Sequence, residues 1–258
     1  MSGRVLISAS AQTAASRATL DLVIGGQMHA RSSVVPEQFW DDAARTNAPW
    51  FVATGHRCAD AAFFAQGAQE TDSFLAMCGV AIRPDDTVLE IGCGLGRMTH
   101  RLADLAGRVI ATDISREMLE QAARNLADRP AVEYVRVAGD GTLPFPDASI
   151  DVVFSYITLQ HVPSVAAQLR YLRESVRVLR PGGSLAVQVR ADAVTARLYD
   201  WTGHLAHFAL GRPTMHRAWL GARPRTADLL AIAGNVEVRR FDRRHTWVVA
   251  HVRALSPR

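Results

Sequence analysis

Three glycines at alternate positions, Gly92, Gly94 and Gly96, follow a short apolar strand that we expect at 87–91. Glycine permits positive φ angles and lets a ligand approach the backbone without meeting a Cβ atom. After Gly96 the apolar residues acquire helical spacing, and the free N–H groups that open a helix attract an anion. The stretch from 88 to 99 is therefore expected to form a cradle for a nucleotide-type ligand.

Two acidic residues follow later strands. Asp113 ends the next expected strand, a position from which a carboxylate accepts hydrogen bonds from ribose hydroxyls. Asp140 lies beyond the third expected strand, where it can accept a hydrogen bond from an exocyclic amine such as that of adenine. Arg97 stands where the dinucleotide motif Gly-x-Gly-x-x-Gly requires its last glycine, so the spacing does not fit NAD.

The composition removes several other chemistries. All 29 basic residues are arginines, because the sequence contains no lysine. A Walker-type phosphate loop, a pyridoxal Schiff base and a lysine nucleophile are therefore excluded. The formal net charge of +4 is small for a nucleic-acid-binding protein, whose basic residues normally gather on one face.

The three cysteines, Cys58, Cys78 and Cys93, predict neither a disulfide framework nor a metal site. They show no Cys-x-x-Cys spacing and no histidine at the spacing of metal ligands. We therefore expect no bound metal and a reducing, cytoplasmic setting. No apolar run approaches the roughly 20 residues that a membrane span requires, so no transmembrane segment is expected.

Apolar runs and helical patterns alternate through the middle of the chain. Five strands are expected at 87–91, 108–112, 132–137, 150–155 and 184–190. The helices between them are expected at 97–106, 115–127 and 164–179, with Ser115 as a cap and Pro181-Gly182-Gly183 as the final stop. Repeated units of this kind predict an α/β fold with a doubly wound, mostly parallel sheet, in which ligands bind at the carboxyl ends of the strands. Strands at 236–241 and 245–253 add an antiparallel hairpin and bring the sheet to seven strands.

The flanking segments are less regular. Residues 1–35 are expected to be a flexible extension, 36–80 a helical cap, and 81–258 the main domain with an insertion at 191–225. Trp50 and Phe51 have two interpretations: they seal the cap onto the core, or they wall a ligand cleft. The insertion carries Trp201 and His204 and has the length of a substrate wall.

At this point the sequence resembles the class I S-adenosylmethionine-dependent methyltransferases, in particular the small-molecule branch related to ubiquinone and menaquinone biosynthesis enzymes. This resemblance implies the Rossmann-like methyltransferase fold and S-adenosylmethionine as cofactor. It says little about the methyl acceptor. The matching segments occur in the family's order and spacing: 88–97, 111–115, 139–147, 154–162 and 179–185.

The resemblance also implies cofactor-binding roles for particular residues. Gly92, Gly94 and Gly96 would meet the methionine end, with Glu90 near its ammonium group. Asp113 would bind the ribose hydroxyls. Ile114 and Met118 would pack against the adenine, and Asp140 would bind its amino group. Gly139, Gly141 and Ser155 are further residues expected to bind the cofactor.

Methyl transfer is an in-line displacement that needs alignment, exclusion of water and, for a protonated acceptor, a base. His161 follows the fourth strand on the acceptor side, and we consider it as a base or acceptor ligand beside the alternative of a merely packed histidine. Tyr156 and Gln160 are candidates for lining the acceptor site, together with Trp50, Trp201 and His204.

The leading hypothesis is therefore an enzyme that methylates O, N or C of a small molecule. One alternative is a nucleic-acid methyltransferase, which the sequence does not favour. The segment 154–157 reads Phe-Ser-Tyr-Ile instead of the Asn/Asp-Pro-Pro-aromatic motif of amino methylation. A further alternative is a cofactor-binding protein of the same fold without methyltransferase activity. The sequence carries no signal for an oligomeric state.

Overall fold

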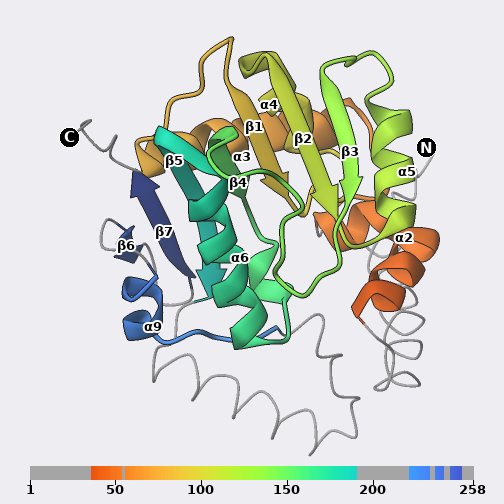
Figure 1. The fold of residues 1–258 in the computed structure, drawn as a ribbon. Helices are drawn as coiled ribbons and strands as arrows, with labels where there is room; N and C mark the ends of the chain where they lie inside the picture. Colours follow the sequence, from red (N-terminus) through yellow and green to blue (C-terminus); the bar gives the residue numbers. More distant parts are fainter. Residues whose placement is uncertain (1–35, 54–55, 191–220, 233–235, 241–244, 252–258) are drawn as a thin grey trace, which may run out of the picture.

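The computed structural model describes residues 36–53, 56–190, 221–232, 236–240 and 245–251 of the chain. The expected extension at 1–35 and residues 191–220 of the expected insertion lie outside the described residues. The helices and strands form an α/β fold around one sheet (Figure 1).

The sheet has seven strands in the order β3-β2-β1-β4-β5-β7-β6. Strands β1 to β5 pair in parallel, β7 is antiparallel to β5, and β6 is antiparallel to β7. The mostly parallel, doubly wound sheet is thus confirmed. The strand bounds are β1 Thr87–Ile91, β2 Arg108–Asp113, β3 Val132–Arg136, β4 Ile150–Ser155, β5 Leu179–Arg190, β6 Val236–Arg240 and β7 His245–His251.

One boundary prediction is wrong. Strand β5 begins at Leu179 instead of 184 and contains the expected turn Pro181-Gly182-Gly183. These residues do not end the preceding helix, because α6 already ends at Val178 and the glycines form an irregularity within the strand. The pairing register with β4 shifts between Ile150 and Val152, and Gly182 has a φ of 88°.

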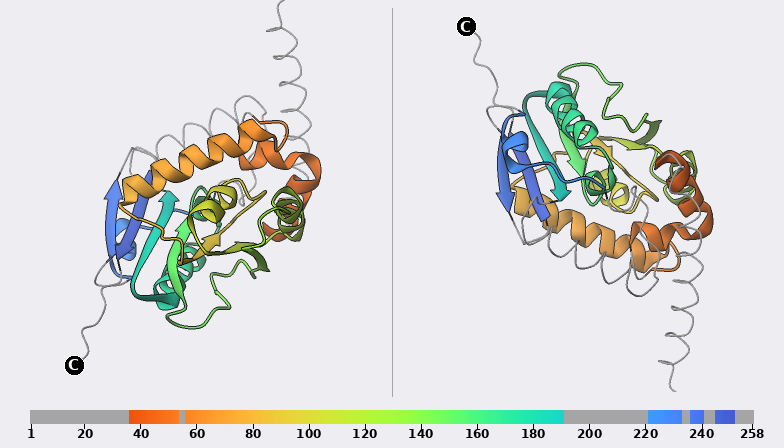
Figure 2. Two further views of the ribbon diagram at one scale, coloured as in Figure 1. Left: turned by 90° about the horizontal axis from the view of Figure 1, so that it is seen from above. Right: turned by 90° about the horizontal axis from the view of Figure 1, so that it is seen from below.

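Helices cover both faces of the sheet, with α3 along one face and α6 along the other (Figure 2). Helix α6 begins after Ser164, whose side chain accepts a hydrogen bond from the N–H of Ala167. Ser115 caps α5 as expected and accepts from the N–H of Met118. The helix bounds are α2 Pro36–Val52, α3 Ala61–Cys78, α4 Thr99–Leu105, α5 Arg116–Asn125, α6 Val165–Val178 and α9 Thr226–Leu230, with a 3₁₀ turn η1 at Leu159–His161.

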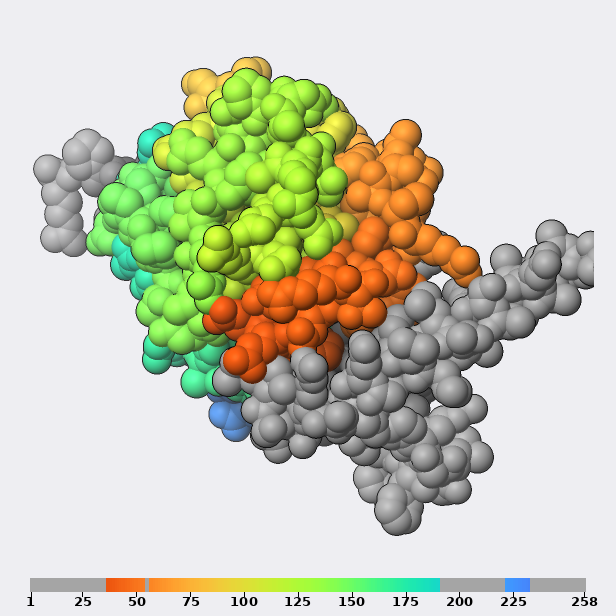
Figure 3. Space-filling model, turned by 90° about the vertical axis from the view of Figure 1, so that its right-hand side faces the viewer, coloured from red at the N-terminus to blue at the C-terminus, as the bar shows by residue number. Residues whose placement is uncertain are grey.

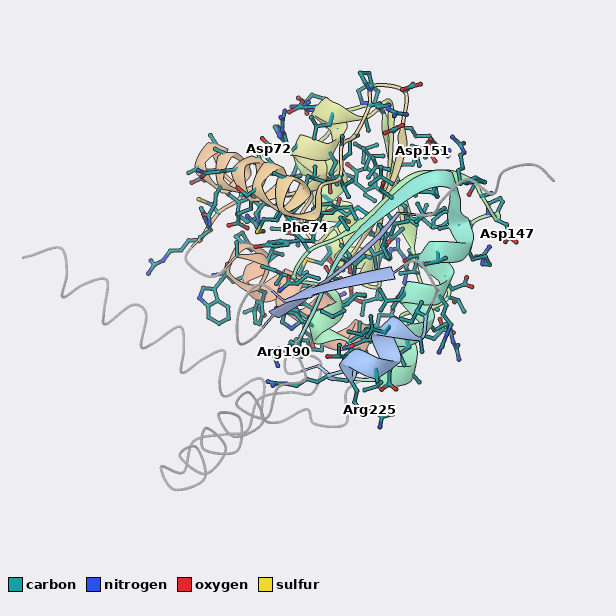
Figure 4. The ribbon with its side chains drawn as sticks, turned by 90° about the vertical axis from the view of Figure 1, so that its left-hand side faces the viewer. Asp72, Phe74, Asp147, Asp151, Arg190 and Arg225 are labelled. Atoms are coloured by element: carbon teal, nitrogen blue, oxygen red, sulfur yellow. The ribbon has the colours of Figure 1, made fainter. Side chains whose placement is uncertain are left out.

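Each face of the sheet has its own apolar core, because successive side chains of a strand point to opposite faces. In β1, Val88 packs with residues of α3 and α4, whereas Leu89 packs with residues of α6. Phe74 projects from α3 toward the strands, where its ring lies 5.4 Å from that of Phe154 (Figure 4). Burial on both faces explains the nearly continuous apolar runs of the central strands.

Helix α2 reaches the rest of the fold through polar contacts with α5. The Ser115 hydroxyl donates to Asp41 Oδ1 at 2.5 Å, and Arg45 forms an ion pair with Glu117 at 2.8 Å. Figure 3 shows α2, in red-orange, packed directly against the yellow-green surface that includes α5. A kink at Asn47, with a φ of −166° and a ψ of 73°, redirects the second half of α2. These contacts place α2 at the carboxyl ends of the strands.

Replacing Gly96 by alanine should destabilise the fold, because its φ of 82° disfavours a side chain and a Cβ there would lie 2.7 Å from Leu126 Cδ1. We expect a loss of about 3 kcal/mol, from left-handed strain and overpacking together. Gly79→Ala is the matched control: its φ is 66°, but nothing lies within 4 Å. That variant should lose only about 1 kcal/mol. Urea unfolding measures both, and equal losses would contradict the packing role of Gly96.

Candidate functional site

A cavity of about 470 Å³ opens at the carboxyl ends of β1, β2 and β4. Its floor is the loop after β1, and α2 contributes Trp40, Phe51 and Val52 to its wall. The remaining sides come from the starts of α5 and α6 and from the segment after β4. Carboxyl ends of parallel strands are where ligands bind in this class of sheet.

The glycine loop is held in place by its neighbours. The N–H groups of Gly92 and Cys93 both donate to the carbonyl of Thr112, at 2.8 and 2.9 Å. Thr158 Oγ1 donates to the carbonyl of Gly92 at 3.1 Å. A Cβ at Gly92 would lie 2.0 Å from Thr158 Cγ2, so glycine is required there by the close approach of the segment after β4.

Asp113 links this loop to the start of α5. Its Oδ2 accepts from the N–H of Gly94 and its Oδ1 from the N–H of Ser115, each at 2.9 Å. Enclosure by protein raises the pKa of this carboxyl, although the backbone N–H groups of Ser115, Gly94 and Ile114 oppose that shift. Each carboxylate oxygen keeps a second acceptor site for a ligand hydroxyl.

Glu90 is a buried acid in the cavity wall. Its side chain accepts a hydrogen bond from Thr99 Oγ1 at 2.6 Å, and the residue is only 2% exposed. Burial raises the pKa of Glu90 to about 7, and Asp113 adds to the rise, whereas Thr99 and Arg97 lower it. A cation beside Glu90 would favour the ionised form.

Asp140 lies at the exposed edge of the cavity. Its Oδ1 accepts from the N–H and the hydroxyl of Thr142, at 2.9 and 2.6 Å, and its Oδ2 lies 3.4 Å from Arg170 Nη1. The Thr142 hydrogen bonds are the main reason that the pKa of Asp140 is lowered. The carboxylate is therefore ionised and available as an acceptor. Ile114, Met118 and Gly139 line the same side.

The segment after β4 supplies an aromatic end of the cavity. His161 and Tyr156 both line it, and the ring of His161 lies 5.5 Å from that of Trp40. Ile157, between them in sequence, has a φ of 57°, which is rare for a β-branched residue. Its N–H donates to Gln188 Oε1 at 2.7 Å.

Five of the expected site residues do not line the cavity. A Cβ on Gly96 would meet Leu126, and one on Gly141 would lie 2.5 Å from the carbonyl of Ala167, so these glycines permit helix packing. The other three are bonded or packed elsewhere: Ser155 donates to the carbonyl of Ile91, Trp50 packs on Phe51, and Gln160 contacts His161 and Gln188. Trp201 and His204 lie outside the described residues.

Several residues at the cavity were missed by sequence reasoning. Trp40 had the helical spacing of a core residue, and nothing in its pattern distinguished a cavity wall. Arg97 was used only to exclude NAD. It is 4% exposed and pairs with Glu70 at 2.8 Å, and its Nε and Nη1 have no hydrogen-bond partner among the residues that the structure describes. Its position directly after the glycine loop was the available signal.

The fold and the site together define the class of protein. A parallel sheet with a glycine loop after β1 and an acid at the end of β2 is a Rossmann-like, nucleotide-type binding architecture. Within that class, residues 89–187 match the family described as the methyltransferase domain. Over this part, which is less than half of the chain, the sequence is similar to a methyltransferase domain.

Two of the relatives are named as methyltransferases. The chain is 38% identical over 175 residues to the 27-O-demethylrifamycin SV methyltransferase of Amycolatopsis mediterranei, which covers 61% of each protein. It is 38% identical over 108 residues to the demethylmenaquinone methyltransferase of Symbiobacterium thermophilum, covering 39% of this chain and 41% of that one. The chain thus spans less than two thirds of the length of these relatives.

A crystal structure of a SAM-dependent methyltransferase from Methanosarcina mazei has the same fold, with a TM-score of 0.53 and 20% identity over 67% of this chain and 95% of that one. The predicted resemblance to S-adenosylmethionine-dependent methyltransferases is confirmed. A probable S-adenosylmethionine-dependent methyltransferase of Mycolicibacterium smegmatis is 39% identical over 100 residues, covering 39% of this chain and 36% of that one, and indicates S-adenosylmethionine as the cofactor. Among the described helices, none is long and apolar enough to cross a membrane.

The buried position of Glu90 predicts an unusual titration in the protein without ligand. Its carboxyl should titrate near pH 7, and Thr99→Val should move the pKa higher, because the Thr99 hydrogen bond stabilises the ionised form. ¹³C NMR of glutamate-labelled protein measures both, and Glu90→Gln assigns the signal. A Glu90 titration near 4.5 would contradict this account of the site.

Proposed function

We propose that the protein transfers the methyl group of S-adenosylmethionine to an O, N or C atom of a small-molecule acceptor. The observation that carries this proposal is that one cavity is lined by Glu90, Asp113 and Asp140 and also by His161 and Tyr156. We assign the three acids to the cofactor and the other two residues to the acceptor. The relatives named as methyltransferases of demethylrifamycin and demethylmenaquinone support a small-molecule acceptor.

The cofactor fits the charges of the site. S-adenosylmethionine carries an ammonium group, and Glu90 is a buried acid whose raised pKa an adjacent cation would lower again. Asp113 would accept hydrogen bonds from the ribose hydroxyls, and Ile114 and Met118 would contact the adenine. Asp140, ionised at the cavity edge, would accept from the adenine amino group.

When bound, the cofactor supplies an electrophilic methyl group on a sulfonium. The chain then has to align the acceptor in line with that group and exclude water. Trp40, Phe51 and Tyr156 offer an apolar aromatic wall for this purpose. An aromatic wall favours a flat, apolar acceptor, and His161 is the titratable group beside it.

Calorimetry with S-adenosylhomocysteine, the demethylated product, tests the proposal directly. Intact protein should bind it, and Asp113→Asn should weaken binding about 10- to 100-fold, because hydrogen bonds to a charged acceptor are worth about 1.5–3 kcal/mol. Asp147→Asn is the matched control: its side chain is 77% exposed and pairs with Arg177, away from the cavity. No binding by intact protein would overturn the proposed function.

The affinity for S-adenosylhomocysteine should also rise with pH. Below about 7 Glu90 is protonated, and a ligand ammonium must displace that proton. Binding should therefore tighten about tenfold between pH 6 and pH 8. Glu90→Gln should remove most of this pH dependence of binding. An unchanged pH dependence in that variant would show that Glu90 is not its cause.

The acceptor class is tested by transfer of a radiolabelled methyl group. Phenols, quinones, acids and amines form one panel, and RNA and DNA form the second. Transfer to the first panel alone is the expected result. Transfer to nucleic acid alone would contradict the small-molecule proposal while leaving the cofactor assignment intact.

A further inference from the structure

Two buried glutamines connect the strained residue Ile157 to His161. Gln188, on β5, is 2% exposed, and Gln160, in η1, is 9% exposed. Gln188 Oε1 accepts from the N–H of Ile157 at 2.7 Å, and Gln188 Nε2 donates to Gln160 Oε1 at 3.4 Å. Gln160 Nε2 lies 3.1 Å from His161 Nε2. The three side chains thus form one hydrogen-bonded chain behind the cavity.

The N–H of Ile157 determines which atoms donate and which accept along this series of hydrogen bonds. A backbone N–H can only donate, so the atom of Gln188 that faces Ile157 must be its carbonyl oxygen. The amide nitrogen of Gln188 then faces Gln160, which must present its own carbonyl oxygen. An amide orientation follows from its network in this way.

The last link therefore has a defined polarity. An amide nitrogen has no acceptor site, so Gln160 Nε2 donates and His161 Nε2 must accept through its lone pair. A neutral imidazole with a bare Nε2 carries its hydrogen on Nδ1.

We propose that Gln188 and Gln160 are positioning residues that fix His161 as the neutral tautomer protonated on Nδ1, with its Nε2 lone pair engaged. A proton reaches Nε2 only if Gln160 gives up this contact. The consequence for methyl transfer rests on the proposed function: His161 acts on the acceptor through its Nδ1 side, or after rotation of Gln160.

The backbone under His161 is fixed by a separate glutamine. Gln168, on α6, is fully buried, and its Nε2 lies 2.8, 2.9 and 3.0 Å from the carbonyl oxygens of Leu159, Val162 and Ala222, which share its two N–H groups. Gln168 therefore positions the main chain of η1, whereas Gln188 and Gln160 determine which ring nitrogen of His161 carries the hydrogen. The two functions can be separated by mutation.

¹⁵N–¹H multiple-bond NMR at pH 8 on the whole ¹⁵N-labelled protein tests the tautomer without any acceptor, and His161→Asn assigns the signals. In wild-type protein we expect a pyrrole-type shift for Nδ1 and a pyridine-type shift for Nε2. The opposite assignment would overturn the proposal while leaving the S-adenosylhomocysteine test of the proposed function untouched.

Two variants test the cause. Gln160→Glu keeps an acceptor for Gln188 but offers an oxygen to the ring, so Nε2 should become protonated. Gln160→Met removes the donor, so both ring shifts should move toward values averaged over the two tautomers. Unchanged ring shifts in both variants would show that another contact fixes the tautomer and would overturn the role of the two glutamines. Should either variant fail to fold, the wild-type spectrum still decides the tautomer.

Discussion

The carboxylate of Asp113 is the interaction on which the site depends. It binds one N–H of the glycine loop and one N–H at the start of α5, so it fixes two elements that come from different strands. Both bonds use an enclosed, charged acceptor, and such bonds are shorter and stronger than neutral ones. A ligand that binds the remaining acceptor positions of this carboxylate meets a loop that is already in place, which reduces the ordering cost of binding.

Burial makes the electrostatics of the cavity depend on the ligand. Burial raises the pKa of both Glu90 and Asp113, and the charge of Asp113 adds to the rise at Glu90. Arg97 is the nearest opposing charge, but it already pairs with Glu70. A positively charged ligand beside Glu90 would offset the cost of ionising this buried acid, whereas a neutral ligand would not.

The sequence was sufficient to predict the sheet and the residues that lie at the cavity because they stand at the end of a strand. Asp113, Glu90 and Gly92 lie at the cavity because a strand end fixes their place relative to the sheet. Gly96 and Gly141 were assigned to the ligand, yet they serve helix packing, because a glycine pattern does not state which atom comes close. Trp40 and Gln188 were missed for another reason. The periodicity of a helix or strand predicts which of its faces is buried, but it does not predict which residues pack against that face.

The two sides of the cavity are joined through α2. The N–H of Ser115 donates to Asp113, and the Ser115 hydroxyl donates to Asp41 of α2. Asp41 directly follows Trp40 in the sequence. Trp40 in turn packs edge-on against His161. The start of α5, which Asp113 positions, therefore also holds the helix that carries Trp40. Because Ser115 is fully buried and uses its hydroxyl for both the Met118 cap and Asp41, neither contact can shift without disturbing the other.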